Sequence, residues 1–189
     1  MGRLGGFQDN VTIHLEGERY DREVKPPAIP LEKITALEPV CLRLTVPEAY
    51  RDENGHMNMR WYLAIFDDAG EVLHERLGLT PEYHRARGTG TVDLEHHIHF
   101  LSEVMPLDRV AVYARAVAFS PKRLHYQLFM VNETRGRLAS IFECINAFMN
   151  AVERKTAPFP PEIAERIAEA VEIGANLDWP PPLCGAMRP

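Results

Sequence analysis

Four side chains able to exchange a proton or a hydrogen bond occupy alternate positions between residues 51 and 58, and large apolar residues follow at once. They are Asp52, Asn54, His56 and Asn58. Attack on an acyl carbonyl needs a base or nucleophile beside the carbon and a hydrogen-bond donor for the oxyanion. Free backbone N–H groups at a helix start near Met59 would supply that donor, within reach of Asp52. Taken alone, the same side chains are equally typical of a turn and a helix cap.

One long helix is predicted from Met59 to Leu77, because apolar side chains recur there at steps of three and four residues. Asn58 is a good N-cap, and Gly78, with Pro81 beyond it, is typical of a helix end. The first two turns are apolar on nearly every side, which predicts that this part of the helix is buried on several sides.

The rest of the body has the alternation of apolar and polar residues that is typical of β-strands. Its short gaps have the composition of hairpin turns, so neighbouring strands are expected to be antiparallel. One sheet wrapped around one helix is the economical way to bury that helix. The predicted fold class is α+β, with an antiparallel sheet of about five strands around one long central helix; the strands are expected at 40–46, 90–100, 109–119, 122–131 and 138–149.

The two ends of the chain differ from this body. The first 39 residues are polar and then proline-rich, so we expect an extended arm, with one short strand near residues 11–15. After the body, a helix is predicted to start at Pro161 and to stop at Gly174, followed by an irregular proline-rich tail. The predicted division is an N-terminal extension (1–39), one domain (40–160), and a C-terminal helix with its tail (161–189).

Composition excludes several classes of protein. A net charge of −6 over 189 residues argues against a general nucleic-acid binder, which needs a basic face. Neither a membrane span nor the apolar core of a signal peptide is present, so no membrane partner is expected. Three cysteines share no short spacing, which suits neither a disulfide framework nor a zinc motif and predicts a cytoplasmic location.

A histidine cluster at 96–99 raises the question of a metal site. His97 and His99 are expected on one strand face together with Asp93 and Glu95. The sequence offers no Cys or second cluster that completes a site, so no metal is predicted. Glu143 lies on an otherwise apolar strand face, where an acid is expected to be paired or to lie near a pocket.

Order of elements and motif together resemble the hotdog-fold acyl-CoA thioesterases of the 4-hydroxybenzoyl-CoA thioesterase group, over about residues 40–160. The family pattern opens the central helix with an acid three residues before a Gly-His-apolar-Asn run. The bacterial branch that includes betainyl-CoA thioesterases adds an H-I-x-aromatic strand with a Glu beyond it and a K-R-x-H strand. The matching residues here are Asp52, Gly55, His56, Met57, Asn58, His97, Ile98, Phe100, Glu103, Lys122, Arg123 and His125; Glu143 fits a further acid, and AFMN (147–150) departs from the branch pattern.

This resemblance implies an acyl-CoA thioesterase that uses no cofactor, with coenzyme A as part of the substrate. It implies a side-by-side homodimer, or a dimer of such dimers, with acyl pockets between subunits. Asp52 would act as nucleophile or as general base on water, while Asn54 and His56 orient water or substrate. The remaining expected site residues are Asn58 and Met59 at the helix start, and Gly55, Trp61, Tyr62, Lys122 and Arg123 for the substrate.

Two alternative functions remain open. Hotdog-fold hydratases and dehydratases carry their histidine five residues after the acid and a proline between, whereas His56 follows Asp52 by four residues with Gly55 between. A non-catalytic acyl-CoA-binding role is the second alternative.

Binding the phosphates of coenzyme A needs a local positive patch in a protein of negative net charge. Lys122 and Arg123 are adjacent in a predicted turn, and Arg suits a bidentate grip on phosphate. Arg85 and Arg87, expected in a loop after the central helix, are the competing pair. All four are otherwise ordinary solvated charges.

Overall fold

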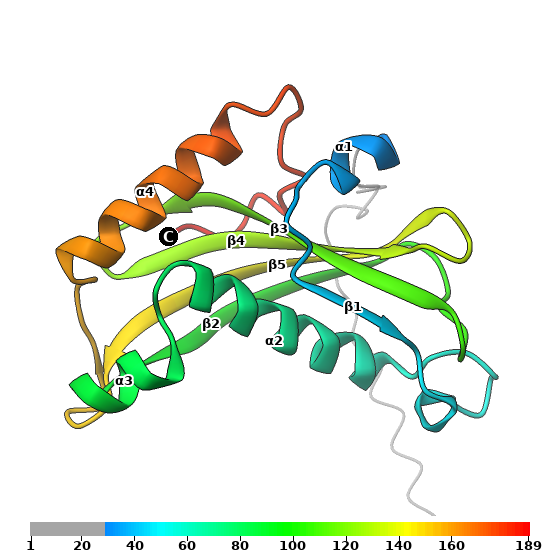
Figure 1. Cartoon of the computed structure of the whole chain (residues 1–189), viewed down its shortest axis with the longest axis horizontal. Coiled ribbons are helices and arrows are strands. Elements are labelled where there is room, and N and C mark those ends of the chain that lie inside the picture. The colour runs from blue at the N-terminus through cyan, green and yellow to red at the C-terminus, as the bar shows by residue number, and fades with distance from the viewer. Residues whose placement is uncertain (1–28) are drawn as a thin grey trace, which may run out of the picture.

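The computed structural model describes residues 29–189. The short strand expected near residues 11–15 lies outside this range. One curved antiparallel sheet forms the body, with strand order β1-β3-β4-β5-β2 and β6 paired beside β5 (Figure 1). The sheet confirms the predicted α+β architecture; its strands are β1 (Leu42–Thr45), β2 (Thr89–Phe100), β3 (Arg109–Phe119), β4 (Arg123–Asn132), β5 (Arg137–Asn150) and β6 (Lys155–Thr156).

The long helix α2 (Met59–Arg76) runs along one face of the sheet, as predicted (Figure 1). Its buried side chains pack into a core against β3, β4 and β5, for example Phe66 on Phe142 at 5.1 Å between ring centroids. The expectation that its first turns are buried on several sides is wrong for this chain. Met59 is 69% exposed and Leu63 43%, because no described element covers that side of the helix.

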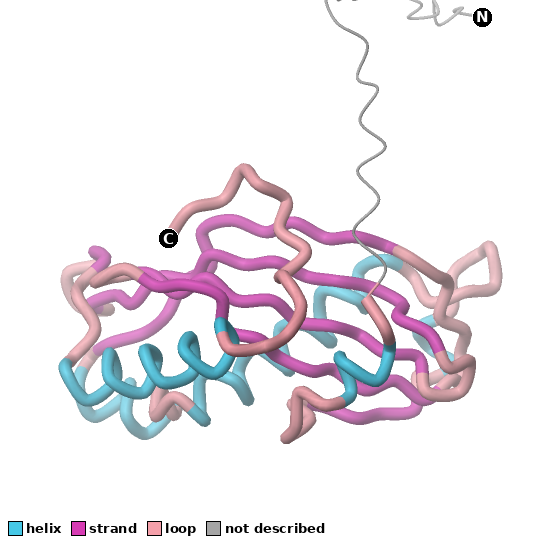
Figure 2. The backbone as a smooth tube through the Cα atoms, turned by 90° about the horizontal axis from the view of Figure 1, so that it is seen from above, coloured by secondary structure: helices cyan, strands magenta, loops and turns pink. Residues whose placement is uncertain are grey.

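A second core lies on the opposite face of the sheet. The short helix α1 (Leu31–Thr35), which the sequence did not predict, packs Ile34 there, and the irregular C-terminal tail adds Trp179 against Phe129 of β4. Figure 2 shows the tail crossing over the strands from the end of the last helix. Both faces of the sheet are thus covered within one chain, which explains why β4 and β5 are buried on both sides.

Helix α4 (Pro161–Ala175) covers the part of the β3 edge that the four-residue strand β1 leaves bare. Its start at Pro161 is confirmed, and it ends at Ala175, one residue beyond the predicted stop at Gly174. A Cβ at Gly174 would lie 2.2 Å from the Ala116 carbonyl oxygen. The glycine is needed there for close approach of helix and strand.

The other sheet edge, β2, is uncovered among the described residues and pairs only with β5. Its apolar side chains are partly exposed, with Val92 at 39%, Leu94 at 43% and Phe100 at 54%. The β2–β5 register shifts between Asp93 and Glu95, which marks a β-bulge at Leu94.

Helix α3 (Pro81–Arg87) occupies the segment that was expected to be a loop after the central helix. Thr80 caps α3, and Pro81 lies in its first turn. Pro81 thus follows the end of α2, as expected, and also begins a second helix. The one-turn helix η1 (Glu48–Tyr50) precedes the polar motif. Among the described helices, none is long and apolar enough to cross a membrane.

Candidate active site

Residues 51–58 form a tight loop that folds back on itself before α2 begins. The amide of Asp52 donates to the His56 carbonyl at 2.9 Å, and the amide of Gly55 donates to the Asp52 carbonyl at 3.1 Å. Gly55 has φ +90°, a conformation that L-residues with side chains rarely adopt. The glycine therefore serves the turn that brings Asp52 and His56 together, and it is not among the residues that line the cavity beside Asp52.

The Asp52 carboxylate is held from two sides. One oxygen accepts the amide of Asn54 at 2.8 Å, and the other lies 3.2 Å from Nδ1 of His56. The Asp52 side chain is only 13% exposed. Asn54 thus contacts the acid through its backbone, whereas its own side chain is exposed. Of the two residues expected to orient the reacting groups, only His56 has its side chain at the acid.

The start of α2 lies directly beside this loop. Asn58 caps the helix as predicted, with its side-chain oxygen accepting the Arg60 amide at 3.1 Å. The Met57 amide donates to the Val104 carbonyl at 2.8 Å, which ties the loop to the segment after β2. No described residue accepts a hydrogen bond from the Met59 amide. That amide is therefore a free donor at the positive end of the helix.

A cavity of about 520 Å³ opens where the loop, the helix start and the end of β2 meet. Its wall is largely apolar, and the Tyr62 and Phe100 rings meet edge to face there at 5.1 Å. Burial raises the pKa of the Tyr62 hydroxyl, so the phenol is neutral at physiological pH. Five predicted site residues line the cavity, together with four that carry the opposite wall: Asp52, His56, Asn58, Met59 and Tyr62, then Phe100, Leu101, Ser102 and Glu103.

Trp61 does not line this cavity. Its ring stacks on Tyr50 with 3.8 Å between centroids and an interplanar angle of 3°, which fixes the loop entry against the helix. The sequence missed Leu101 and Ser102 as cavity residues. The resemblance matched Phe100 and Glu103 to the branch pattern but did not place them beside the motif, since alternation along a strand does not indicate which loop the strand meets.

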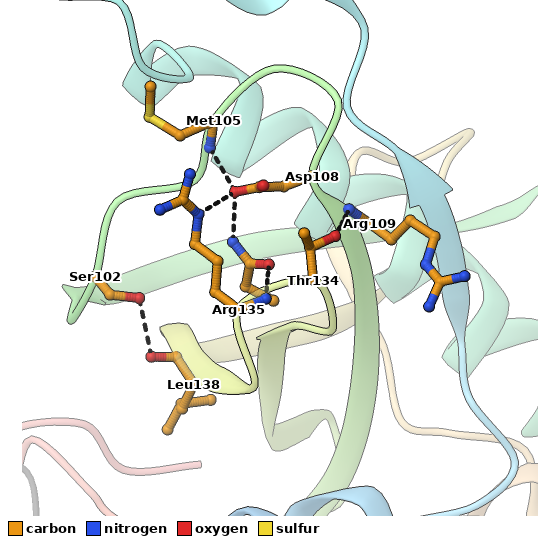
Figure 3. A network of polar contacts seen from close by, with 8 residues as sticks. Ser102, Met105, Asp108, Arg109, Thr134, Arg135 and Leu138 are labelled. Atoms are coloured by element: carbon orange, nitrogen blue, oxygen red, sulfur yellow. Dashed lines mark hydrogen bonds and ion pairs between the residues drawn. The ribbon is translucent and has the colours of Figure 1, made fainter.

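A hydrogen-bond network centred on Asp108 anchors the segment 101–108 that forms the opposite wall (Figure 3). The buried Asp108 carboxylate accepts the Met105 amide at 2.9 Å, the Asn132 side chain at 2.7 Å and the Arg135 guanidinium at 2.7 Å. Burial acts to raise the pKa of Asp108, but these donors outweigh it and lower the pKa below its usual value. The segment between Phe100 and β3 is thus rigidly tied to the β4–β5 turn.

Lys122 and Arg123 are not near Asp52 in this chain. They lie at the β3–β4 turn, where Arg123 pairs with Ala147, whereas the cavity lies where Phe100 pairs with Ser140. Seven residues along β5 separate these positions, or about 23 Å at the strand rise. The competing pair Arg85 and Arg87 belongs to α3 and is ion-paired with Glu82 and Glu162.

Glu143 is paired with other residues, which is the first of the two alternatives expected for it from the sequence. Its carboxylate lies 2.8 Å from His125 and accepts the Cys184 amide at 2.7 Å, on the face covered by the tail. Burial acts to raise the Glu143 pKa, but the contacts with His125 and Cys184 outweigh it and lower the pKa. Glu143 is not among the residues that line the Asp52 cavity.

The reasoning that no Cys joins the β2 histidines is wrong. Cys144 of β5 lies opposite His96, and the bulge at Leu94 brings Asp93 to the same face as His96. Donor atoms of Asp93, His96 and Cys144 lie within 4.8 Å of one another. His97 and His99 lie on the other face, with 4.5 Å between their ring centroids.

Comparison with known proteins adds the following similarities. A model of the thioesterase-like superfamily matches residues 46–167. The betainyl-CoA thioesterase of Pseudomonas aeruginosa is 29% identical over 129 residues, which cover 68% of this chain and 81% of that protein. The L-carnitine dehydrogenase/betainyl-CoA thioesterase of Ruegeria pomeroyi is 28% identical over 90% of this chain, which spans only 35% of that longer protein. Among solved structures, a Staphylococcus aureus protein in complex with CoA superimposes with a TM-score of 0.71 at 26% identity, covering 79% of this chain and 95% of the other.

Proposed function

This chain belongs to the thioesterase-like superfamily, and on that premise we propose that it hydrolyses acyl-CoA thioesters to a free acid and CoA, with Asp52 as the catalytic carboxylate. The observation that carries the proposal is the meeting of two groups at one cavity. The oriented Asp52 carboxylate and the free Met59 amide both border it.

Asp52 acts on water or on the carbonyl carbon itself. As general base it takes a proton from a water molecule, whose oxygen attacks the carbon. As nucleophile it forms an acyl anhydride that water then hydrolyses. In both cases the Met59 amide stabilises the oxyanion, and the C–S bond breaks as the CoA sulfur leaves and takes up a proton. His56 holds the acid in place, and Asn58 caps the start of α2 beside the substrate.

The lining of the cavity supports a small acyl group with a positive charge. The Glu103 carboxylate and the rings of Tyr62 and Phe100 border the same space as Asp52. A quaternary ammonium group is attracted to aromatic faces and to carboxylates. The betainyl group in the names of the two relatives is of this kind, so we propose a betainyl-like cationic acyl group as the preferred substrate.

We propose that Lys122 and Arg123 bind the CoA phosphates, at the far end of the long pantetheine arm. Their distance from Asp52 within one chain suits a ligand that carries its thioester and its phosphates at opposite ends. The Lys122 ammonium group hydrogen-bonds only to the Thr156 carbonyl, at 3.5 Å, among the described residues, and Arg123 is exposed, so both are accessible to an anion.

The proposed active form is a homodimer, or a dimer of dimers, in which two β2 edges form one continuous sheet. The bare edge of β2 and the exposed Met59 and Leu63 on the first turns of α2 support this arrangement. All three cysteines are unpaired, which supports a reducing compartment, and we propose that the enzyme works in the cytoplasm.

The activity is tested by incubating the purified chain with short, branched, aromatic and betainyl CoA esters and measuring free thiol. We expect thiol release, fastest with the betainyl ester. The same samples are assayed for hydration of an enoyl-CoA. Hydration without thiol release would replace the thioesterase by a hydratase, and binding without either reaction would make the chain an acyl-CoA-binding protein.

A further inference from the structure

A second cavity, of about 690 Å³, lies between α2 and the strands β2, β4 and β5. It shares no lining residue with the Asp52 cavity. Its helix wall carries Phe66, Glu71 and His74, and its sheet wall carries Asp93 and His96. The proposed thioesterase site makes no use of these polar groups, so they need a separate explanation.

The β-bulge in β2 creates the cluster on the sheet wall. Asp93 pairs with Asn146 and Glu95 with Ile145, which leaves Leu94 as the extra residue. Without the bulge, Asp93 and His96 would point to opposite faces of the strand. With it, both side chains face α2, where His96 lies opposite Cys144.

Three side chains of different chemistry converge at this bulge. The Asp93 carboxylate lies 2.8 Å from Nε2 of His96 and accepts the Asn146 side chain at 2.6 Å through its other oxygen. Oxygen, nitrogen and sulfur donors from Asp93, His96 and Cys144 are all within 4.8 Å of one another. Such spacing allows one ion to be bound by all three after small side-chain rotations.

Two of the three side chains, Asp93 and Cys144, have shifted pKa values. Burial acts to raise the pKa of Asp93, but hydrogen bonds from Asn146 and His96 outweigh it, so the net pKa is lowered and the acid is charged. Burial, with the charge of Asp93 added, raises the pKa of the Cys144 thiol well above its usual value. An ion that binds there must therefore displace a proton from Cys144.

A buried imidazole on the facing helix independently indicates a ligand in this cavity. His74 is 8% exposed, and its Nε2 has no hydrogen-bond partner among the described residues. Burial lowers the pKa of His74 to about 4, so the ring is neutral at physiological pH. Buried polar atoms in folded proteins normally have a partner, which suggests that a ligand or its bound water supplies one here.

We propose that Asp93, His96 and Cys144 form a site for a divalent transition metal, with Zn²⁺ as the preferred ion. A mixed carboxylate, imidazole and thiolate set suits zinc and excludes magnesium and calcium, which take oxygen ligands. Three protein ligands leave a fourth coordination position for water or another ligand. The ion joins the edge strand β2 to β5 at the bulge, separate from the hydrolytic site.

The test measures metal binding by the full chain, freed of any affinity tag and treated with a chelator. Equilibrium dialysis against Zn²⁺ is expected to give one ion per chain, and Co²⁺ is expected to give a thiolate-to-cobalt charge-transfer band. His96→Ala, Asp93→Asn and Cys144→Ala should each weaken Zn²⁺ binding by at least about 10-fold. Because Cys144 is buried, the two variants at the partly exposed Asp93 and His96 keep the test valid if Cys144→Ala fails to fold.

Matched controls are Cys184→Ser and His99→Ala, which remove a partly exposed thiol and an imidazole from the other face. Both should bind Zn²⁺ like the wild type. Absence of Zn²⁺ in the dialysed wild type, or unchanged binding and spectra in His96→Ala and Asp93→Asn, would overturn the proposal. Thioester hydrolysis by the chelated protein is measured in parallel and should persist, so failure of the metal site and of the thioesterase proposal are told apart.

Discussion

Asp52 and His56 form the part of the molecule where residue identity matters most. The acid is nearly buried, and its two oxygens are occupied by the Asn54 amide and by the His56 ring. Each neighbour therefore has a different role, which substitution can separate.

His56→Ala removes the side chain that contacts Asp52, whereas Asn54→Ala leaves the Asn54 amide in place. We expect the turnover of His56→Ala to fall by about 10-fold, which is less than the loss on removing a general base. The turnover of Asn54→Ala should change little. Steady-state kinetics on the best CoA ester give both values. A loss at His56 larger than at Asp52 would favour a hydratase-like role for the histidine.

Arg123→Glu is predicted to raise the Michaelis constant for CoA esters while sparing turnover, because phosphate binding is remote from the bond broken. The increase should shrink as salt is added, since exposed charges are screened. Arg85→Glu is the control, because Arg85 is already ion-paired with Glu82. Lost turnover at an unchanged Michaelis constant would remove Arg123 from the phosphate role.

Among single residues, five of the expected site residues lie together in the structure, and Gly55, Trp61, Lys122 and Arg123 do not line the same cavity. Spacing and resemblance placed Asp52, His56, Asn58, Met59 and Tyr62, all of which line one cavity. They did not separate side-chain from backbone roles at Asn54, because a two-residue spacing fits both. The Asp93 cluster was missed because a bulge changes the strand face without any one-residue signal.

The segment 101–108 shows how elements hold the site. It carries the cavity wall from Phe100 to Glu103, and its position depends on the buried acid Asp108. A substitution that weakens these contacts should therefore disturb the cavity wall more than the rest of the sheet.

Asp108→Ala is predicted to lower the free energy of unfolding by about 3 kcal/mol at pH 7, because it leaves three buried or half-buried donors without their charged acceptor. The folded-state pKa of Asp108 is lowered, so its contribution is present above the unfolded value of about 3.9 and is lost as pH falls through the folded value. Urea denaturation should show the two proteins converging below about pH 4. The control is Asp178→Asn, which changes an exposed acid paired with Lys33 and should leave the free energy of unfolding near that of the wild type. If Asp108→Ala unfolded at the same urea midpoint as the wild type, the network would not anchor the loop.

Element boundaries followed from periodicity for α2 and for the strands β2 to β5, because each buries a continuous apolar stripe. Helix α1 and the C-terminal tail were not recognised as packing elements. Each contributes one or two large side chains, such as Ile34 and Trp179, and so few residues show no period. The role of Gly174 depends on the Ala116 backbone, which is distant in sequence.

Within residues 29–189, one edge of the sheet is covered and the other is bare. Helix α4 covers β3, while β2 shows unpaired backbone groups and exposed apolar side chains. An edge of this kind is a template for another strand, which supports the proposed pairing between chains.

Sedimentation of the purified chain is predicted to give a dimer or a tetramer. Val92→Lys, at the exposed β2 edge, should shift it toward monomer and reduce activity, whereas Val152→Lys, at the exposed β5–β6 turn, should change neither. A wild-type monomer with full activity would contradict the dimer proposal.

For the whole molecule, the sequence predicted the architecture but not which side chains of α2 are exposed. Resemblance over residues 40–160 implied a sheet around a helix and a paired chain. The exposure of Met59 and Leu63 contradicted the prediction from apolar composition, because composition cannot tell which neighbour covers a side chain.

Turnover of Asp52→Asn on the fastest CoA ester tests the central claim most directly. The amide keeps the shape and the hydrogen bond from Asn54 but cannot act as base or nucleophile, so free-thiol release should fall by about 100-fold or more. Binding of the ester, measured by calorimetry on the same variant, should persist within a few-fold. Turnover of Asp52→Asn close to that of the wild type would contradict the assignment of Asp52 as the catalytic carboxylate.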